Sequence, residues 1–157
     1  MIQFSLAYFV LSFVPNQNER DMYPSEIVMP MKADLTSAGF EDLTTPEQVD
    51  DAVNAKGTTL LVINSVCGCA AGNARPGVKM AVQGENKPDR ITTVFAGFDG
   101  DAVARARQYM LPYPPSSPSI ALFKDGKLVH MVERHQIEGH TASSIAEGLS
   151  KAFEANC

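Results

Sequence analysis

An apolar run over residues 59–64 is followed at once by two cysteines and then by small and polar residues. A short run rich in leucine, valine and isoleucine is typical of a strand that is buried on both faces of a sheet. The residues after Cys67-Gly68-Cys69 suit the first turns of a helix. We therefore expect the two thiols to lie where a buried strand passes into a helix, and the rest of the chain to be organised around that junction.

Thiols at such a junction are expected to be reactive. The N-terminus of a helix has unpaired N–H groups and a partial positive charge. Both favour a thiolate over a thiol, so the pKa of a cysteine there is lowered. Cys67 is the predicted nucleophile and Cys69 the predicted resolving thiol. A disulfide across one intervening residue would be strained and easily reduced. A structural role is the alternative for each cysteine.

Composition limits the classes of function. The 157 residues suit one domain, with 45% hydrophobic and 20% charged residues. The net charge of −5 gives no basic patch for nucleic acid. Three cysteines are too few for a disulfide framework, and the close pair points instead to redox chemistry in a reducing compartment. We therefore expect a cytoplasmic protein that does not bind nucleic acid.

The N-terminal segment stands apart from the rest of the chain. Residues 2–14 form an apolar run of 13 residues, whereas a membrane-spanning helix needs about 20. A secretory signal would need a basic start and a small-residue cleavage site, and neither is visible. We expect residues 1–21 to be a dispensable extension and the domain to occupy residues 22–157. A membrane or secretory role for the extension is the alternative.

Periodicity and turn residues predict the remaining elements. Helices are expected at 24–38 and 46–57, from the cysteines to about residue 83 with a kink at Pro76, at 99–110, and after a cap at Ser143 or Ser144. Strands are expected at 59–64, 91–96 and 119–123, and a hairpin at Asp125-Gly126 leads to a fourth that ends near residue 132. Strands that are joined through helices should be parallel. These elements predict an α/β fold with a mixed four-stranded sheet and helices on both faces.

This order of elements resembles the thioredoxin fold. In that fold a redox cysteine motif follows a central strand, and the helix behind it carries an internal proline. Ser117-Pro118-Ser119, followed by a strand and a turn, is similar to the cis-proline loop of thioredoxins. The resemblance implies that Pro118 is a cis-proline that faces the sulfurs, with Ser117 and Gly68 supporting the site.

The spacing Cys-Gly-Cys departs from the usual Cys-x-x-Cys, and that departure is itself a family mark. The stretch Asn64-Ser65-Val66-Cys67-Gly68-Cys69-Ala70-Ala71-Gly72 closely resembles the bacilliredoxins. So do Thr44-Thr45 and Arg134-His135-Gln136-Ile137-Glu138-Gly139. The resemblance covers about residues 22–157.

The bacilliredoxin resemblance implies an enzyme that reduces mixed disulfides between bacillithiol and protein cysteines. Thiolated proteins would be its substrates, and bacillithiol or a similar small thiol its co-substrate. It implies no tightly bound cofactor, and a reductase or small-thiol system would regenerate the enzyme. Family members have also been regarded as thiol–disulfide isomerases.

Two further alternatives remain open. Cys157 is either an additional redox thiol or a free thiol on a frayed end. Two close cysteines also occur in metal or cluster sites, but zinc needs about four ligands. His130, His135 and His140 show no ligand spacing, so we expect no metal.

Overall fold

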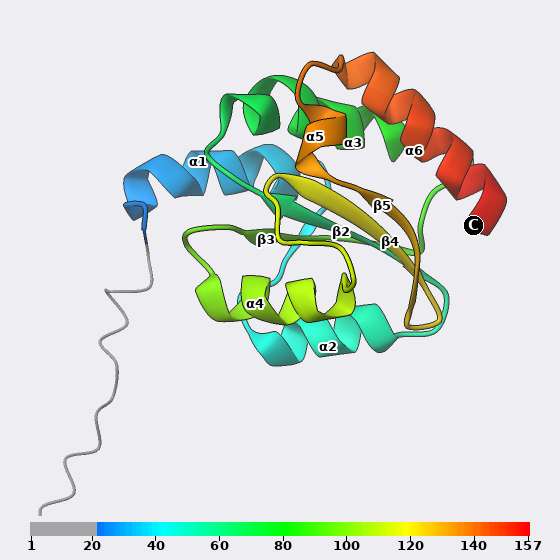
Figure 1. Cartoon of the computed structure of the whole chain (residues 1–157), viewed down its shortest axis with the longest axis horizontal. Coiled ribbons are helices and arrows are strands. Elements are labelled where there is room, and N and C mark those ends of the chain that lie inside the picture. Colours follow the sequence, from blue (N-terminus) through cyan, green and yellow to red (C-terminus); the bar gives the residue numbers. More distant parts are fainter. Residues whose placement is uncertain (1–21) are drawn as a thin grey trace, which may run out of the picture.

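The computed structural model describes residues 22–157 and forms one mixed sheet between two layers of helices (Figure 1). The strand order is β1-β3-β2-β4-β5. The strands are β1 (Glu41–Asp42), β2 (Thr58–Asn64), β3 (Arg90–Phe95), β4 (Ser119–Lys124) and β5 (Lys127–Val132). The predictions for residues 1–21, including the apolar run, lie outside the described residues.

The predicted mixed sheet is confirmed, with two corrections. It has five strands rather than four, because the two-residue strand β1 pairs with β3 in parallel. A strand of two residues is too short to leave a periodic pattern. The parallel direction predicted for strands joined through helices holds for β2 and β3 but is wrong for β4, which is antiparallel to β2.

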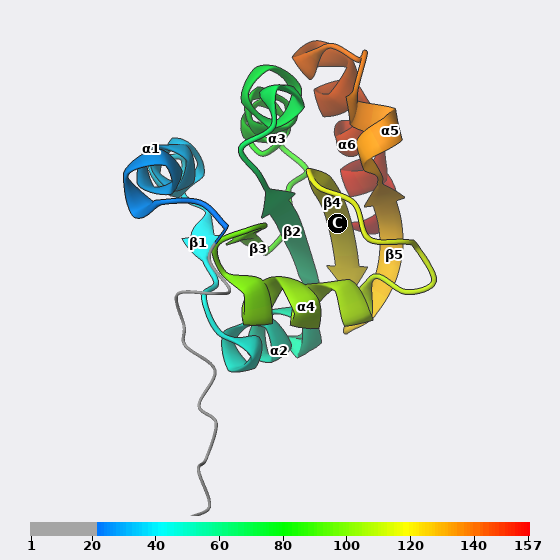
Figure 2. The ribbon, with the colours of Figure 1, turned by 60° about the vertical axis from the view of Figure 1, so that its left-hand side comes forward.

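The proline-rich loop explains the direction of β4. After α4 (Gly100–Tyr109), residues 110–118 carry the chain back across the molecule to the carboxyl end of β2 (Figure 2). The chain enters the sheet there, so that Ser119 pairs with Ile63 near the end of β2. A crossover that brings the chain back to the end of the sheet from which it left produces an antiparallel neighbour.

Helices cover both faces of the sheet, as Figure 1 shows. One layer holds α1 (Ser25–Thr36), α3 (Arg75–Ala81), α5 (Arg134–Ile137) and α6 (Ala142–Asn156), and the other holds α2 (Pro46–Asn54) and α4. Alternate residues of β2 face the two layers: Leu60 and Val62 pack with the first, and Leu61 and Ile63 with the second. The expected burial of this strand on both faces is confirmed.

Most predicted helix boundaries hold because local capping sets them. Thr45 and Gln48 form the expected capping box at the start of α2. The last helix is different, since Thr141 caps it and accepts a hydrogen bond from the N–H of Ser144. The predicted caps Ser143 and Ser144 are therefore wrong by a few residues. The four-residue helix α5 has no predicted counterpart, because a single turn is too short to show helical periodicity.

The helix after the cysteines changes geometry near Pro76, as predicted. Residues Ala70–Ala74 form a π-helical segment, in which the N–H of Arg75 donates to the carbonyl of Ala70. Pro76 follows in the first turn of α3. Proline has no N–H to donate, so the regular helical ladder is interrupted at this position. The interruption lies about two turns after the cysteine pair.

No helix between residues 22 and 157 combines the length and the apolar character that a membrane crossing requires.

Candidate active site

The cysteine pair lies where β2 ends, on a turn held by side-chain hydrogen bonds. The side chain of Asn64 accepts from the N–H of Ser65 at 2.9 Å and donates to the carbonyl of Met31 at 3.1 Å. The N–H of Cys67 donates to the Ser65 hydroxyl at 3.3 Å. These bonds fix the backbone between the last strand residue and the first thiol, so the position of Cys67 is set by buried polar groups.

The sulfur of Cys67 accepts hydrogen bonds from two N–H donors. The N–H of Cys69 lies 3.4 Å from it and Nη2 of Arg134 lies 3.3 Å from it. The pKa of Cys67 is lowered, first by the hydrogen bond from the Cys69 thiol and further by the N–H groups of Cys69 and Ala70 and the charge of Arg134, against the effect of burial.

The two thiols differ in acidity. Burial raises the pKa of Cys69, and the hydrogen bond to Cys67 and the negative charge of that neighbour raise it further. Cys67 is therefore the more acidic thiol, in the order that the sequence predicts. Both are half-buried and free in this structure.

Arg134 joins three parts of the site. Its Nη1 donates to the carbonyl of Ser117 at 3.1 Å, while Nε and Nη2 both donate to Oε1 of Glu138, at 3.1 and 2.9 Å. The guanidinium therefore bridges α5, the proline loop and Cys67. Sequence reasoning included Arg134 and Glu138 only within the family-like stretch and gave neither a role. Helix α5 and the thiols approach only in the folded chain.

The proline loop has the cis peptide bond that the resemblance implies. The Ser117–Pro118 peptide bond is cis and Pro118 is buried, and the Leu111–Pro112 bond is also cis. Ser117 lies in the same hollow as Cys67. Gly68 is exposed, and a Cβ at this position would meet no atom within 4 Å. Glycine is thus not sterically required between the two cysteines.

A hollow of about 450 Å³ lies over the Cys67 sulfur, and we call it the thiol hollow. Its wall consists of Met22, Tyr23, Ser65, Val66, Cys67, Ala96, Gly97, Arg107, Ser117 and Arg134. The backbone N–H groups of Met22 and Tyr23 both donate to the carbonyl of Gly97, at 2.8 and 3.2 Å. The ring of Tyr23 lies so close to Gly97 that a Cβ there would approach it to 2.6 Å. The start of the described chain therefore forms one side of the hollow.

The three histidines do not join the cysteine pair in a possible metal site. Within residues 22–157, one group of three metal-ligand side chains forms, from Cys67, Cys69 and Glu138, whose ligand atoms lie within 4.8 Å of one another. It includes none of the three histidines, and its carboxylate already pairs with Arg134. Cys157 is exposed at the far end of α6 and does not line the thiol hollow (Figure 1).

Comparison with known proteins agrees with this geometry. The family model described as "Disulphide isomerase" matches residues 23–157. A bacilliredoxin of Cytophaga hutchinsonii is 57% identical over 133 residues, which cover 85% of this chain and 98% of the relative. A bacilliredoxin of Bacillus cereus is 50% identical over 137 residues, which cover 87% and 95%.

Solved structures show the same fold at low identity. Mitochondrial thioredoxin 3 of Saccharomyces cerevisiae in its oxidised form has a TM-score of 0.53 and 15% identity, covering 78% of this chain and 98% of that one. The oxidised thioredoxin of Plasmodium falciparum has a TM-score of 0.55 and 15% identity, covering 73% and 99%. The expected thioredoxin fold is confirmed.

Proposed function

We propose that this protein, a thiol–disulfide oxidoreductase that belongs to the bacilliredoxin family, reduces mixed disulfides between bacillithiol and protein cysteines. The observation that carries the proposal is the environment of Cys67. Its sulfur faces an open hollow, accepts hydrogen bonds from Cys69 and Arg134, and has a second thiol two residues away. The names of the relatives support bacillithiol as the small thiol.

The first chemical step uses Cys67 alone. Its thiolate attacks the bacillithiol sulfur of the mixed disulfide, and an electron pair from Cys67 forms the new S–S bond. The old S–S bond breaks, and its electron pair leaves with the protein sulfur, which takes up a proton. The substrate protein is thereby released as a thiol, and Cys67 carries the small thiol.

The second step removes the small thiol. Cys69 loses its proton and attacks the Cys67 sulfur, which releases bacillithiol and leaves a Cys67–Cys69 disulfide; an external thiol can attack in its place. Two electrons from a reductase or a small-thiol system then restore both thiols. We propose that these reactions occur in the cytoplasm, without a tightly bound cofactor or a metal ion.

Two serine variants test this sequence of steps. Each is incubated with a bacillithiolated protein, and the products are weighed by mass spectrometry. Cys67→Ser should release no substrate thiol, because no thiolate remains to attack. Cys69→Ser should release the substrate thiol and accumulate Cys67 joined to bacillithiol. If Cys67→Ser stays active and Cys69→Ser does not, the two roles are reversed. If the wild-type protein removes no bacillithiol, the proposal is wrong.

Disulfide isomerisation is a second candidate, supported by the description of the matching family model. Isomerisation needs an attacking thiol but no net electron transfer. The Cys69→Ser variant should then restore native bonds in a scrambled multi-disulfide protein about as well as the wild type. Failure of both the wild type and Cys69→Ser to restore native bonds would exclude this second function.

A further inference from the structure

Arg107 is set apart from the other arginines of the described chain. It projects from the last turn of α4 and lines the thiol hollow together with Cys67 and Arg134. Its Nε is buried without a hydrogen-bond partner, and within residues 22–157 its guanidinium forms no hydrogen bond or ion pair. Burial alone lowers its pKa. The side chain of Arg107 is half-buried, and its buried Nε has no hydrogen bond to compensate for the loss of water.

The other four arginines in residues 22–157 all have partners. Arg75 pairs with Asp34, Arg90 donates to backbone carbonyls, Arg105 pairs with Asp50, and Arg134 pairs with Glu138. Arg105 lies on the same helix as Arg107, two residues away, and its partner Asp50 raises its pKa. The fold therefore supplies a carbonyl or a carboxylate to each of these arginines and supplies none to the arginine in the thiol hollow.

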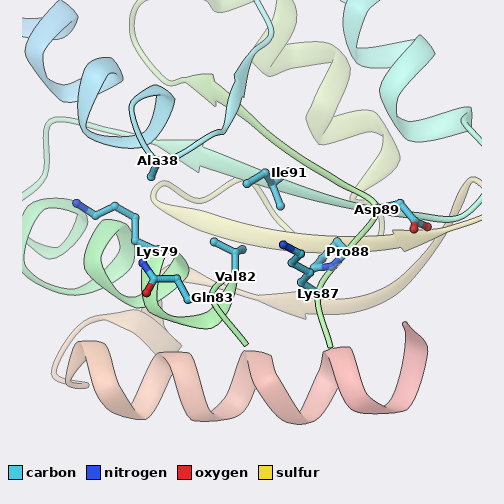
Figure 3. Close-up of a pocket in the computed structure, with 8 residues that line it drawn as sticks. All are labelled: Ala38, Lys79, Val82, Gln83, Lys87, Pro88, Asp89 and Ile91. Atoms are coloured by element: carbon cyan, nitrogen blue, oxygen red, sulfur yellow. The ribbon is translucent and has the colours of Figure 1, made fainter. Parts of the chain in front are cut away.

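A second hollow has different charged residues. It has a volume of about 290 Å³, and α3, β3 and the segment between them supply most of its wall, which includes neither an arginine nor a cysteine (Figure 3). Val82 and Ile91 form its apolar part, and it has two lysines: Lys79, which is paired with Asp34, and Lys87, which is exposed to solvent. The net charge of the chain is −5. Arg134 is paired with Glu138, so Arg107 is the cation of the thiol hollow that has no carboxylate partner within residues 22–157.

The size of the thiol hollow favours a small ligand. Its volume of about 450 Å³ is within the range of about 300–1,000 Å³ for small-molecule sites. One group must come close to the Cys67 sulfur during the reaction, namely the disulfide of the substrate. The part of the substrate that fits beside it is the small thiol rather than a folded segment of the substrate protein.

We propose that the thiol hollow binds a carboxylate of the small thiol in the mixed disulfide, with Arg107 as its partner. This inference rests on the proposed function and specifies its substrate class as acidic low-molecular-weight thiols. A carboxylate held by Arg107 would place the sulfur of the small thiol next to Cys67. That sulfur would form the new S–S bond, and the protein sulfur would leave with the electron pair of the broken bond.

Matched mixed disulfides test the inference. One carrier protein with a single cysteine is joined to 3-mercaptopropionate, to 6-mercaptohexanoate, or to the alcohols of the same lengths, 3-mercaptopropanol and 6-mercaptohexanol. The rate of carrier thiol release by the reduced enzyme is measured for each. At least one acid should react about tenfold faster than its alcohol, the size expected for one charge-assisted hydrogen bond. Because the carrier is constant, a preference arises from the small thiol.

Three arginine variants show which residue causes the preference for the acid. In Arg107→Gln the ratio of acid rate to alcohol rate should fall close to one, and Arg107→Lys should restore part of it. Arg105→Gln changes the net charge equally, two residues away, and should keep the wild-type ratio. The ratio is internal to each variant, so partial unfolding does not imitate the effect.

The outcomes separate this inference from the proposed function. If the enzyme releases the carrier thiol from none of these mixed disulfides, and from none with bacillithiol, the proposed function is contradicted. Equal rates for each acid and its alcohol would leave that function standing and overturn the carboxylate site. A preference that survives Arg107→Gln, or that falls equally in Arg105→Gln, would also overturn it, because long-range charge would then be the cause.

Discussion

The two ends of strand β2 differ in how completely their polar groups are paired. At the amino end, the N–H of Gly57 donates to Asp125 and the N–H of Thr58 donates to Asp89, each at 2.8 Å. The N–H of Asp89 returns a bond to the Thr58 hydroxyl at 3.0 Å. At the carboxyl end, the Cys67 sulfur accepts N–H hydrogen bonds from Cys69 and Arg134, and Arg107 has a buried Nε without a hydrogen-bond partner.

This difference indicates different roles for the two ends. Reciprocal hydrogen bonds at the amino end close the loops around β2 and leave little for a ligand to gain. At the carboxyl end, hydrogen-bond donors such as the Arg107 guanidinium stay unpaired. This lowers the stability of the fold but leaves the donors free to bind a substrate. Substitutions at the amino end should therefore act on stability, and substitutions at the carboxyl end on reactivity.

Arg134→Gln should give the largest effect, confined to the carboxyl end. Loss of the cation disfavours the Cys67 thiolate and raises the pKa of this thiol. The thiolate fraction increases with pH through that pKa, so the rate profile should move to higher pH. At pH 7 the rate of alkylation by iodoacetamide should fall about threefold to tenfold and should recover in alkaline solution.

Arg134→Lys is the matched variant, because it keeps the charge but loses the planar fork that contacts Ser117 and Glu138. Its profile should lie between those of the wild type and Arg134→Gln. A profile that does not move in Arg134→Gln would show that Arg134 does not stabilise the thiolate.

Gly57→Ala should affect the amino end. Gly57 has a φ of +92°, and a Cβ there would approach Oδ2 of Asp89 to 2.3 Å. Strain at such a position costs about 1–3 kcal/mol, which urea unfolding would measure, while alkylation of Cys67 should keep its wild-type rate. Gly148→Ala is the control, since a Cβ in that position of α6 meets nothing within 4 Å and should stabilise the helix slightly. Equal changes in the two variants would contradict the role of Gly57.

A chain that begins at Met22 should show the smallest effect. Its free energy of unfolding should stay within about 0.5 kcal/mol of the full chain, and its turnover should be unchanged. Met22 and Tyr23 would still donate to Gly97 and line the thiol hollow. A chain that begins at Ser25 lacks both residues and should react more slowly with the mixed disulfides. A large loss in the first chain would show that residues 1–21 contribute to the domain.

The sequence by itself determined the parts that depend on neighbouring residues. The continuous apolar run and β-branching of residues 59–64 predict a strand buried on both faces, and Thr45 and Gln48 predict a helix start, because these signals act within a few residues. The cysteine pair at the strand–helix junction was predicted for the same reason. The pKa of Cys67 is lowered first by the hydrogen bond from the Cys69 thiol and then by the N–H of the same residue, so its higher acidity also depends largely on a close neighbour in the sequence.

Only the tertiary structure decided how distant segments meet. It set the antiparallel direction of β4, because that depends on where the proline loop returns to the sheet. It also brought Arg134 to Cys67, 67 residues away in the sequence, and Arg107 into the same hollow. Periodicity records which face of an element is buried, but not which side chains from other elements lie opposite it. The thiols were therefore predictable from the sequence, whereas the cations around them were not.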